Sequence, residues 1–263
     1  MQSRLHANTV ARRGHRVLGT WIDALSWDDA IGKVLTWSAR RESRYVCVCN
    51  VHSVVTARHD VELRRALDGA DLSTSDGAPI AWAMRRLGLV SQERIAGPDL
   101  MWRYLHHAER LGQTIFLYGS TYGTLNSLRR AIAREFPQIE VRGMLSPPFR
   151  KPSLIEDESE IAAINDSGAH LVFIGLGCPK QEKWMAAHRG KINAVMVGVG
   201  AAFDFHAGMK SRAPLWWQQH GLEWLYRLGA EPRRLLRRYL VTNTLFMVGF
   251  AKQLILAKLS PPT

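Results

Sequence analysis

The chain has 263 residues, 46% of them hydrophobic, and is long enough to bury a sizeable core in one large domain or two small ones. Its formal net charge of +12 suits an anionic partner, such as a nucleotide, a nucleic acid or an acidic membrane surface. The three cysteines lack the spacing of a disulfide framework or a zinc site, so Cys47 and Cys49 are expected to be reduced core thiols of a cytoplasmic protein.

The N-terminal segment, residues 1–16, carries four arginines but no apolar stretch, which is not the pattern of a signal peptide. We expect this basic segment to be flexible. The best candidate for a membrane span, LFMVGFA at 245–251, is cut short by Lys252 and falls below the roughly 20 residues that a spanning helix needs. We therefore expect a chain that can lie on a membrane but does not cross one.

Four short apolar runs, bounded by Gly or Asn and mostly β-branched or aromatic, have the pattern of buried parallel strands. They are YVCVC at 45–49, TIFLYG at 114–119, HLVFIG at 170–175 and AVMVGV at 194–199. Helical patterns lie between them at 54–67, 98–112 and 121–136. This alternation predicts an α/β core over residues 17–206, a Rossmann-like, mostly parallel sheet with helices on both faces.

The character of the sequence changes after residue 206. The stretch RAPLWWQQHGLEWLYRLGAEPRRLLRRYL (212–240) is rich in Trp and Arg and has no strand pattern, so we expect helices with a break at 229–232. Pro232 suits the first turn of a final helix, where its missing N–H costs little. Residues 207–263 are therefore predicted to form a helical, Arg-rich C-terminal appendage on the α/β core.

Three of the predicted strands end in glycine turns, two of them with a Gly-x-Gly pattern. A glycine turn before a helix gathers backbone N–H groups into an anion site, and ligands of open α/β sheets bind beyond the carboxyl ends of the strands. The alternative is that the glycines only permit tight turns. Neither Gly-x-Gly is a dinucleotide fingerprint, because Lys180 and Phe203 stand where its third glycine belongs. The candidate substrate-binding residues of these turns are Gly119, Ser120, Gly175, Gly177, Pro179, Lys180, Gln181, Gly198 and Gly200.

Two aspartates are placed where a catalytic carboxylate could lie. Asp76, in STSDGAPIAW, could cap the following helix or act as a general base, and spacing alone favours the cap. Asp204 could be a base, a cap or the partner of an arginine, and with His206 it makes only a weak metal motif. The chain has no Asp-x-Asp pair, with which many nucleotide-sugar enzymes hold a divalent ion.

A cluster of arginines marks the appendage. Arg234, Arg237 and Arg238 are spaced to lie near one face of the final helix, and Arg227 comes shortly before them. Arginine binds phosphate through two parallel hydrogen bonds and keeps its charge. The leucines between the arginines equally fit an amphipathic helix on a membrane surface.

Taken together, these stretches resemble the WecG/TagA/CpsF family of bacterial glycosyltransferases over roughly residues 17–240. The motifs that carry the resemblance are Asn50 after the first core strand, SDGAPIAWAMRRLG, ERIAGPDL, LYGS, GLGCPKQEKW, GVGAAFDFHAG, RAP and LEWLYRLGAEPRRLLRRYL. The resemblance implies transfer of a sugar from a UDP-sugar to a polyprenyl-diphosphate-linked saccharide, with inversion and without a metal or other cofactor. The implied donors are N-acetylmannosamine, its uronic acid or glucose, and the sequence leaves this choice and the polymer open.

The resemblance also assigns roles to individual residues. Asp76 would be the general base that deprotonates the acceptor hydroxyl, and Gln181 would contact donor or acceptor. As catalytic cations, Arg227, Arg234 and Arg237 would face the diphosphate and offset the charge that grows on the leaving UDP.

Asn50 and Asp204 are expected among the substrate-binding residues. Val48 stands where the family often has threonine, so a hydroxyl contact at that position is in doubt. The appendage is expected to dock peripherally on the inner leaflet of the cytoplasmic membrane, where the lipid-linked acceptor lies, and self-association of the chain is left open.

Two other hypotheses share parts of this pattern. A non-catalytic, UDP-sugar-binding regulatory module would have the same crevice without turnover. A nucleic-acid binder is suggested by charge alone and lacks any known motif, so no nucleic-acid partner is expected.

Overall fold

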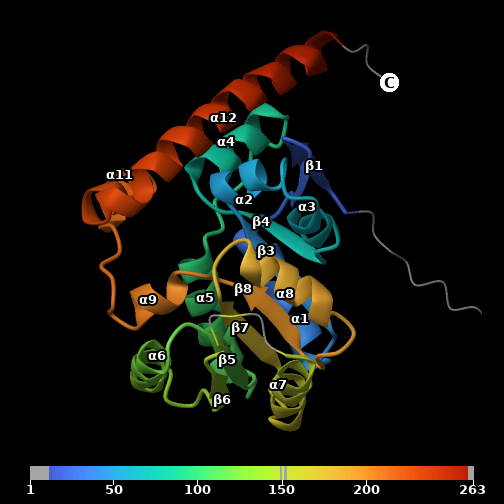
Figure 1. The fold of residues 1–263 in the computed structure, drawn as a ribbon, viewed down its shortest axis with the longest axis vertical. Coiled ribbons are helices and arrows are strands. Elements are labelled where there is room, and N and C mark those ends of the chain that lie inside the picture. Colours follow the sequence, from blue (N-terminus) through green and yellow to red (C-terminus); the bar gives the residue numbers. More distant parts are fainter. Residues whose placement is uncertain (1–11, 149, 151–152, 260–263) are drawn as a thin grey trace, which may run out of the picture.

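A six-stranded sheet, parallel throughout, forms the centre of the protein (Figure 1). The computed structural model describes residues 12–148, 150 and 153–259, apart from the side chains of Arg234 and Lys258. The strand order is β4-β3-β8-β7-β5-β6, and a separate antiparallel hairpin, β1-β2, lies beside it. The strands are β1 (Gly14–Val17), β2 (Thr20–Asp23), β3 (Arg44–Cys49), β4 (Leu72–Ser75), β5 (Ile115–Gly119), β6 (Val141–Leu145), β7 (Leu171–Gly175) and β8 (Val195–Gly198).

Helices cover both faces of the sheet, which confirms the predicted Rossmann-like α/β fold. The core helices are α1 (Trp27–Ala39), α2 (Val51–Thr56), α3 (Val61–Asp68), α4 (Ala78–Arg86), α5 (Gly97–Arg110), α6 (Tyr122–Glu135), α7 (Leu154–Asp166), α8 (Lys180–His188) and α9 (Ala202–His206). Side chains alternate along each strand between two apolar clusters. Cys47 and Cys49 share one face with α2, α3, α4 and α8, whereas Val46 and Val48 face α1, α5 and α6.

The four predicted strands are β3, β5, β7 and β8. The prediction of one continuous helix over 54–67 is wrong, because two helices, α2 and α3, occupy that stretch. Asp60 interrupts it and begins α3 by accepting a hydrogen bond from the Leu63 N–H at 2.9 Å. Cys47, Cys49 and Cys178 are free thiols, and the first two are fully buried.

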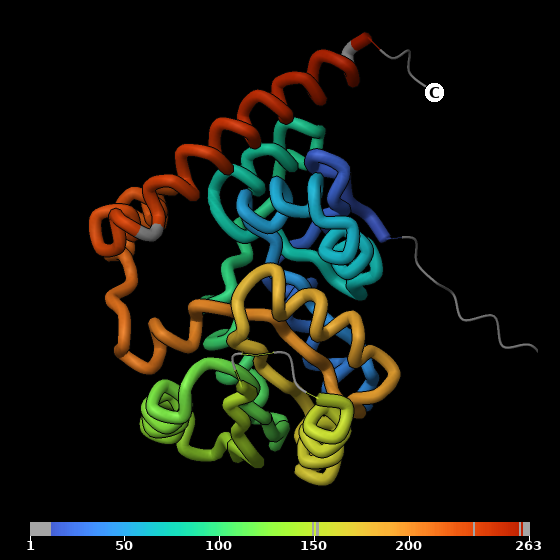
Figure 2. The backbone as a smooth tube through the Cα atoms, in the orientation of Figure 1, coloured from blue at the N-terminus to red at the C-terminus, as the bar shows by residue number. Residues whose placement is uncertain are grey.

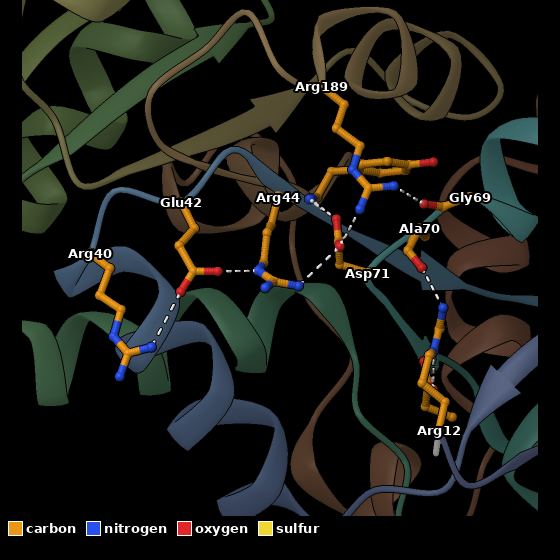
Figure 3. A network of polar contacts seen from close by, with 10 residues as sticks. Arg12, Arg40, Glu42, Arg44, Gly69, Ala70, Asp71 and Arg189 are labelled. Carbon is orange, nitrogen blue, oxygen red and sulfur yellow. Dashed lines mark hydrogen bonds and ion pairs between the residues drawn. The ribbon is translucent and has the colours of Figure 1, made fainter. Parts of the chain in front are cut away.

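Ion pairs fix the strands at the amino-terminal end of the sheet (Figure 3). Asp71, just before β4, accepts hydrogen bonds from the side chains of Arg44 at 3.2 Å and Arg189 at 2.7 Å. Arg12 contacts Asp23 at 2.6 Å and the carbonyl of Ala70 at 2.5 Å. The expected boundary between residues 16 and 17 falls inside β1, and residues 1–11 of the expected flexible segment lie outside the described residues.

The appendage consists of α10 (Leu215–Gln219), α11 (Glu223–Ala230) and α12 (Pro232–Leu259). Figure 2 shows the chain leaving α9 and returning as one long helix beside the core. Phe246 and Phe250 of α12 are buried against the core, where the Phe250 ring packs edge-on against Trp82 of α4 at 5.4 Å. Gln253 donates to the Arg16 carbonyl at 2.6 Å and so ties the helix to β1.

The expected length of the apolar stretch near the C-terminus is corrected by α12. The helix continues through Lys252, and its stretch Leu235–Ala257 is 23 residues long with a mean hydropathy of 1.5. By length and composition alone, that stretch could cross a membrane. The uninterrupted apolar run at 245–251 is shorter than this stretch, because single polar residues such as Lys252 interrupt the apolar pattern without ending the helix.

Candidate active site

A cavity of about 410 Å³ lies beyond the carboxyl ends of β3, β4 and β8. The core contributes its floor, and α11 and the first turns of α12 contribute its cover. Ligands of open parallel sheets bind in this position. The predicted site residues that line the cavity are Asn50, Asp76, Gly177, Gln181, Gly198, Gly200 and Arg227.

Asp76 follows β4 directly and is held beside Asn50. Its backbone N–H donates to the Cys49 carbonyl at 2.8 Å, and its carboxylate accepts a hydrogen bond from the Asn50 side chain. Asn50 caps α2 by accepting from the Ser53 N–H at 3.1 Å, so its amide has a fixed orientation. The cap role that spacing favoured for Asp76 is wrong, because Gly77, with φ +83°, is the N-cap of α4 and no side chain caps that helix.

The surroundings of Asp76 make it a stronger base than an ordinary aspartate. Burial raises its pKa to about 6, and the charge of Glu223 adds to this rise. Arg94, Asn50 and Arg227 act in the opposite direction and favour the charged form. At neutral pH the carboxylate is therefore ionised for the most part, and it is poised close to the pH at which it would accept a proton.

The two Gly-x-Gly turns meet at Gln181. The Gln181 Oε1 accepts a hydrogen bond from the Gly177 N–H at 3.2 Å. A Cβ atom at Gly198 would lie 3.0 Å from the Gln181 Nε2, and one at Gly200 would lie 3.4 Å from Oε1. These glycines therefore leave room for a side-chain amide at the floor of the cavity.

A second, larger cavity of about 1230 Å³ lies on the other side of the 175–180 loop and is lined by other predicted site residues. Its lining includes Ser120, Gly175, Pro179 and Lys180, and it shares only Cys178 with the first cavity among the described lining residues. The predicted substrate-binding residues are thus divided between two cavities.

Gly119, Asp204 and Arg237 line neither cavity. A Cβ atom at Gly119 would lie 2.7 Å from the Gly175 backbone, so this glycine lets β5 and β7 approach each other. Asp204 forms an ion pair with Lys210 at 3.0 Å. Arg237 is exposed, and the side chain of Arg234 lies outside the described residues.

His206 does not combine with Asp204 into a metal site. Its ring stacks on Trp102 with 3.5 Å between centroids, and its Nε2 donates to the Pro98 carbonyl at 2.9 Å. Burial lowers the pKa of His206 to about 4, so the ring is neutral. Across the described part of the chain, no group of three or more His, Cys, Asp or Glu side chains is arranged to hold a metal ion.

Two arginine-carboxylate pairs fasten the appendage over the cavity, and sequence reasoning missed both. Arg94 pairs with Glu223, and its Nη1 also donates to the Gln218 carbonyl at 3.3 Å. Arg212 forms a two-bond pair with Asp99, with both distances 2.7 Å. All four side chains belong to motifs quoted above, ERIAGPDL, RAP and LEWLYRL, but spacing alone does not show which arginine meets which carboxylate.

On α12, the arginine that lines the cavity is the neighbour of the predicted Arg237. Arg238 lines the cavity and Arg237 points outward, and a step of one residue turns a helix by about 100°. Arg238 acts on His52 of α2, whose pKa is lowered by burial and by this arginine. Arg94, Arg227 and Arg238 thus supply positive charge around the Asp76 carboxylate.

A parallel α/β sheet with the Asp76 carboxylate below a cover of arginines is typical of an enzyme for an anionic substrate. The chain belongs to the WecG/TagA/CpsF family of glycosyl transferases, whose model matches residues 15–259. It is 29% identical over 204 residues to an N-acetylglucosaminyldiphosphoundecaprenol N-acetyl-beta-D-mannosaminyltransferase of Bacillus spizizenii (strain ATCC 23059 / NRRL B-14472 / W23), with 77% of each chain covered. The resemblance seen in the sequence is confirmed, and the protein is a glycosyltransferase.

The raised pKa of Asp76 gives a testable dependence of stability on pH. Because the folded-state pKa of about 6 exceeds the ordinary aspartate value of 3.8, the charged carboxylate lowers the free energy of unfolding above pH 6 and has no effect on it below pH 4. A two-unit shift corresponds to about 3 kcal/mol, and partial exposure of the side chain reduces this to about 1–2 kcal/mol. We expect Asp76→Asn to raise the free energy of unfolding by that amount at about pH 8 and to change it little at about pH 4.

Urea denaturation across this pH range measures the effect. Asp29→Asn is the control with the opposite sign, because hydrogen bonds from Ser26 lower the pKa of Asp29, and its charge therefore stabilises the fold above its unfolded pKa. An equal loss of stability in Asp76→Asn at every pH would contradict the assignment.

Proposed function

We propose that this glycosyltransferase moves a sugar from a UDP-sugar to a polyprenyl-diphosphate-linked saccharide, with inversion, in the synthesis of a cell-surface polysaccharide. The observation that carries the proposal is Asp76, held in a cavity below arginines of the appendage, in a chain matched by its family from residue 15 to 259. The name of the Bacillus relative favours N-acetylmannosamine as donor sugar and an N-acetylglucosamine-diphosphate lipid as acceptor. The uronic acid and glucose donors are alternatives that an assay separates.

In the proposed reaction, the Asp76 carboxylate removes the proton of the acceptor hydroxyl as its oxygen attacks the anomeric carbon. The new glycosidic bond forms on the face opposite UDP, and the bond from the anomeric carbon to the diphosphate breaks. UDP leaves with that electron pair. Arg227 and Arg238 face the cavity and would offset the negative charge on the departing diphosphate. In many other enzymes a divalent ion stabilises this charge. We therefore propose a metal-independent reaction.

The central experiment measures UDP release over a panel of UDP-sugars, with a polyprenyl-diphosphate-linked N-acetylglucosamine as acceptor and EDTA in a parallel tube. We expect Asp76→Asn to lower kcat by about 10³-fold while the Kd of UDP changes by less than about threefold, because a general base acts on the transition state. Below pH 6, kcat/KM of the wild type should fall about tenfold per pH unit as Asp76 becomes protonated.

Asp28→Asn, an exposed position of α1, is the control for the loss of a carboxylate. Loss of activity in EDTA would contradict the metal-independent reaction. Tight binding of UDP-sugars without transfer to any acceptor would support the non-catalytic module instead.

Arg237 and Arg238 form a matched pair that tests the role of the cover. Arg238→Ala should lower kcat/KM by about 10- to 100-fold, because a cation beside the leaving diphosphate is lost. Arg237→Ala removes the same charge from the exposed face and should change kcat/KM for a short-chain, water-soluble acceptor by less than about threefold. Equal losses in the two variants would show that only the net charge of the appendage matters.

We also propose that α12 docks the enzyme on the cytoplasmic leaflet as a peripheral protein. One side of the helix packs on the core through Leu235, Phe246 and Phe250. The opposite side exposes a band of large apolar residues: Leu236, Leu240, Val241, Met247, Val248, Ile255, Leu256 and Leu259. A helix that is bound to protein on one side and apolar on the other fits the interface between lipid and water, where a lipid-linked acceptor lies.

Val248→Glu tests this docking, because its side chain is 66% exposed in the middle of the apolar band. We expect the variant to bind vesicles containing anionic lipid about tenfold more weakly, since apolar burial is lost and a negative charge is added. Transfer to a short-chain, water-soluble acceptor should not change. Val90→Glu, at a position 80% exposed on the core, is the matched control and should bind vesicles as the wild type does.

A further inference from the structure

The side-chain amide of Gln181 joins the two glycine turns at the floor of the cavity. The Gly177 N–H can only donate, so the atom that faces it must be the Gln181 Oε1, and Nε2 must point the other way. Gln181 is 4% exposed, and the space around its amide exists because Gly198 and Gly200 have no side chains. The amide thus fills the space between the turns that follow β7 and β8, bonded to the first and packed against the second.

The second contact of this amide is made by the next residue along α8. The Gln181 Nε2 donates to the Glu182 Oε1 at 2.9 Å. A primary amide has two N–H groups on its nitrogen, and this bond uses one of them. Gln181 lines the cavity, so the remaining N–H is available to an oxygen acceptor of the substrate, such as a phosphate oxygen or a sugar hydroxyl.

Glu182 is an unusual residue for its position. It is 1% exposed and lines the cavity beside Gln181, and the thiols of Cys47, Cys49 and Cys178 lie close enough to feel its charge. Burial raises the pKa of Glu182 and of each thiol, so this pocket disfavours a negative charge on any of them. A buried carboxyl without a cation beside it is costly, and an apolar residue of similar size would pack there at less cost.

We propose that Glu182 is a positioning residue, whose carboxyl holds the Gln181 amide where it braces the 177 turn against the 198–200 turn and offers its second N–H to the substrate. The identity of that substrate rests on the proposed transferase function, whereas the brace rests on the hydrogen bonds to Gly177 and Glu182 and on the close packing of the amide against Gly198 and Gly200. Glu182 acts through Gln181 and does not itself transfer a proton in the reaction.

Two substitutions separate positioning from packing. Glu182→Gln keeps a carbonyl oxygen that can accept from Gln181 and resembles the carboxyl group in shape, so kcat/KM should stay within about threefold of the wild type. Glu182→Leu keeps much of the volume but removes the acceptor, and a displaced amide should lower kcat/KM by about 10- to 100-fold. Glu160→Leu is the control, because Glu160 is also buried but lines neither cavity, and it should leave kcat/KM unchanged.

A double-mutant cycle asks whether Glu182 acts through Gln181. Gln181→Ala alone should reduce kcat/KM by at least as much as Glu182→Leu, and the double variant should be no worse than Gln181→Ala. If the two losses multiply, or if Glu182→Gln is as damaging as Glu182→Leu, the proposed role is wrong.

A measurement without substrate keeps the inference separate from the proposed function. The NMR resonances of the Gln181 side-chain NH2 group, assigned by their loss in Gln181→Ala, should shift and exchange faster with water in Glu182→Leu but not in Glu182→Gln. Unchanged resonances in Glu182→Leu would overturn the inference. A wild type that transfers no sugar would contradict the proposed function only. If Glu182→Leu does not fold, the activity of Glu182→Gln and its Gln181 side-chain resonances test the inference instead.

Discussion

The hydrogen bond from the Asp76 N–H to the Cys49 carbonyl, 2.8 Å long, is the contact on which the site depends. It extends the ladder between β3 and β4, in which Cys49 pairs with Ser75, by one residue beyond the strands. After it, the two chains separate: Asn50 caps α2, and Gly77 turns with φ +83° into α4. The side chains of Asn50 and Asp76 are therefore left adjacent at the floor of the cavity, and the sheet sets their positions.

The chemistry of Asp76 depends in turn on the appendage. Glu223 and Arg227 come from the cover, and both act on the charge of Asp76. Arg94 forms an ion pair with Glu223 and so holds the cover in place. The same arginine also lowers the pKa of Asp76. Removing the cover would expose the carboxylate to water and return its pKa toward that of an ordinary aspartate. Closure and the strength of the proposed base are therefore physically coupled.

Much of the fold could be predicted because buried parallel strands are apolar along their whole length, as in β3, β5, β7 and β8. The strand β4 (LSTS) was missed because three of its four residues are polar although all four are buried. Its sequence therefore lacks the apolar pattern of a core strand. Ser75 donates to the Glu93 carbonyl, and Thr74 to the Ile95 carbonyl, contacts between segments that no local pattern reveals.

The site was predicted less completely than the fold, for a geometric reason. A glycine turn has the same sequence pattern whether it cradles a ligand or lets two backbones approach, and here Gly119 does the latter. The 175–180 loop separates two cavities, so neighbours in sequence such as Lys180 and Gln181 face different spaces. On α12, the neighbours Arg237 and Arg238 also face different surroundings, because Arg238 lines the cavity and Arg237 is exposed. In each case sequence spacing identifies the segment that lies near a cavity, and only the packing of the structure shows which of its side chains line that cavity.

The helix α12 places the proposed chemistry and the proposed membrane contact on one rigid element. Arg238, Thr242 and Asn243 line the cavity near its start, whereas Phe246 and Phe250 anchor its next turns on the core. An α-helix rises 1.5 Å per residue, so the apolar band on its outer side begins within about one turn of the cavity. In the proposed docking, a substrate whose diphosphate enters the cavity would keep its polyprenyl chain in the bilayer, and the packing of Phe246 and Phe250 would set the distance between the cavity and the lipid.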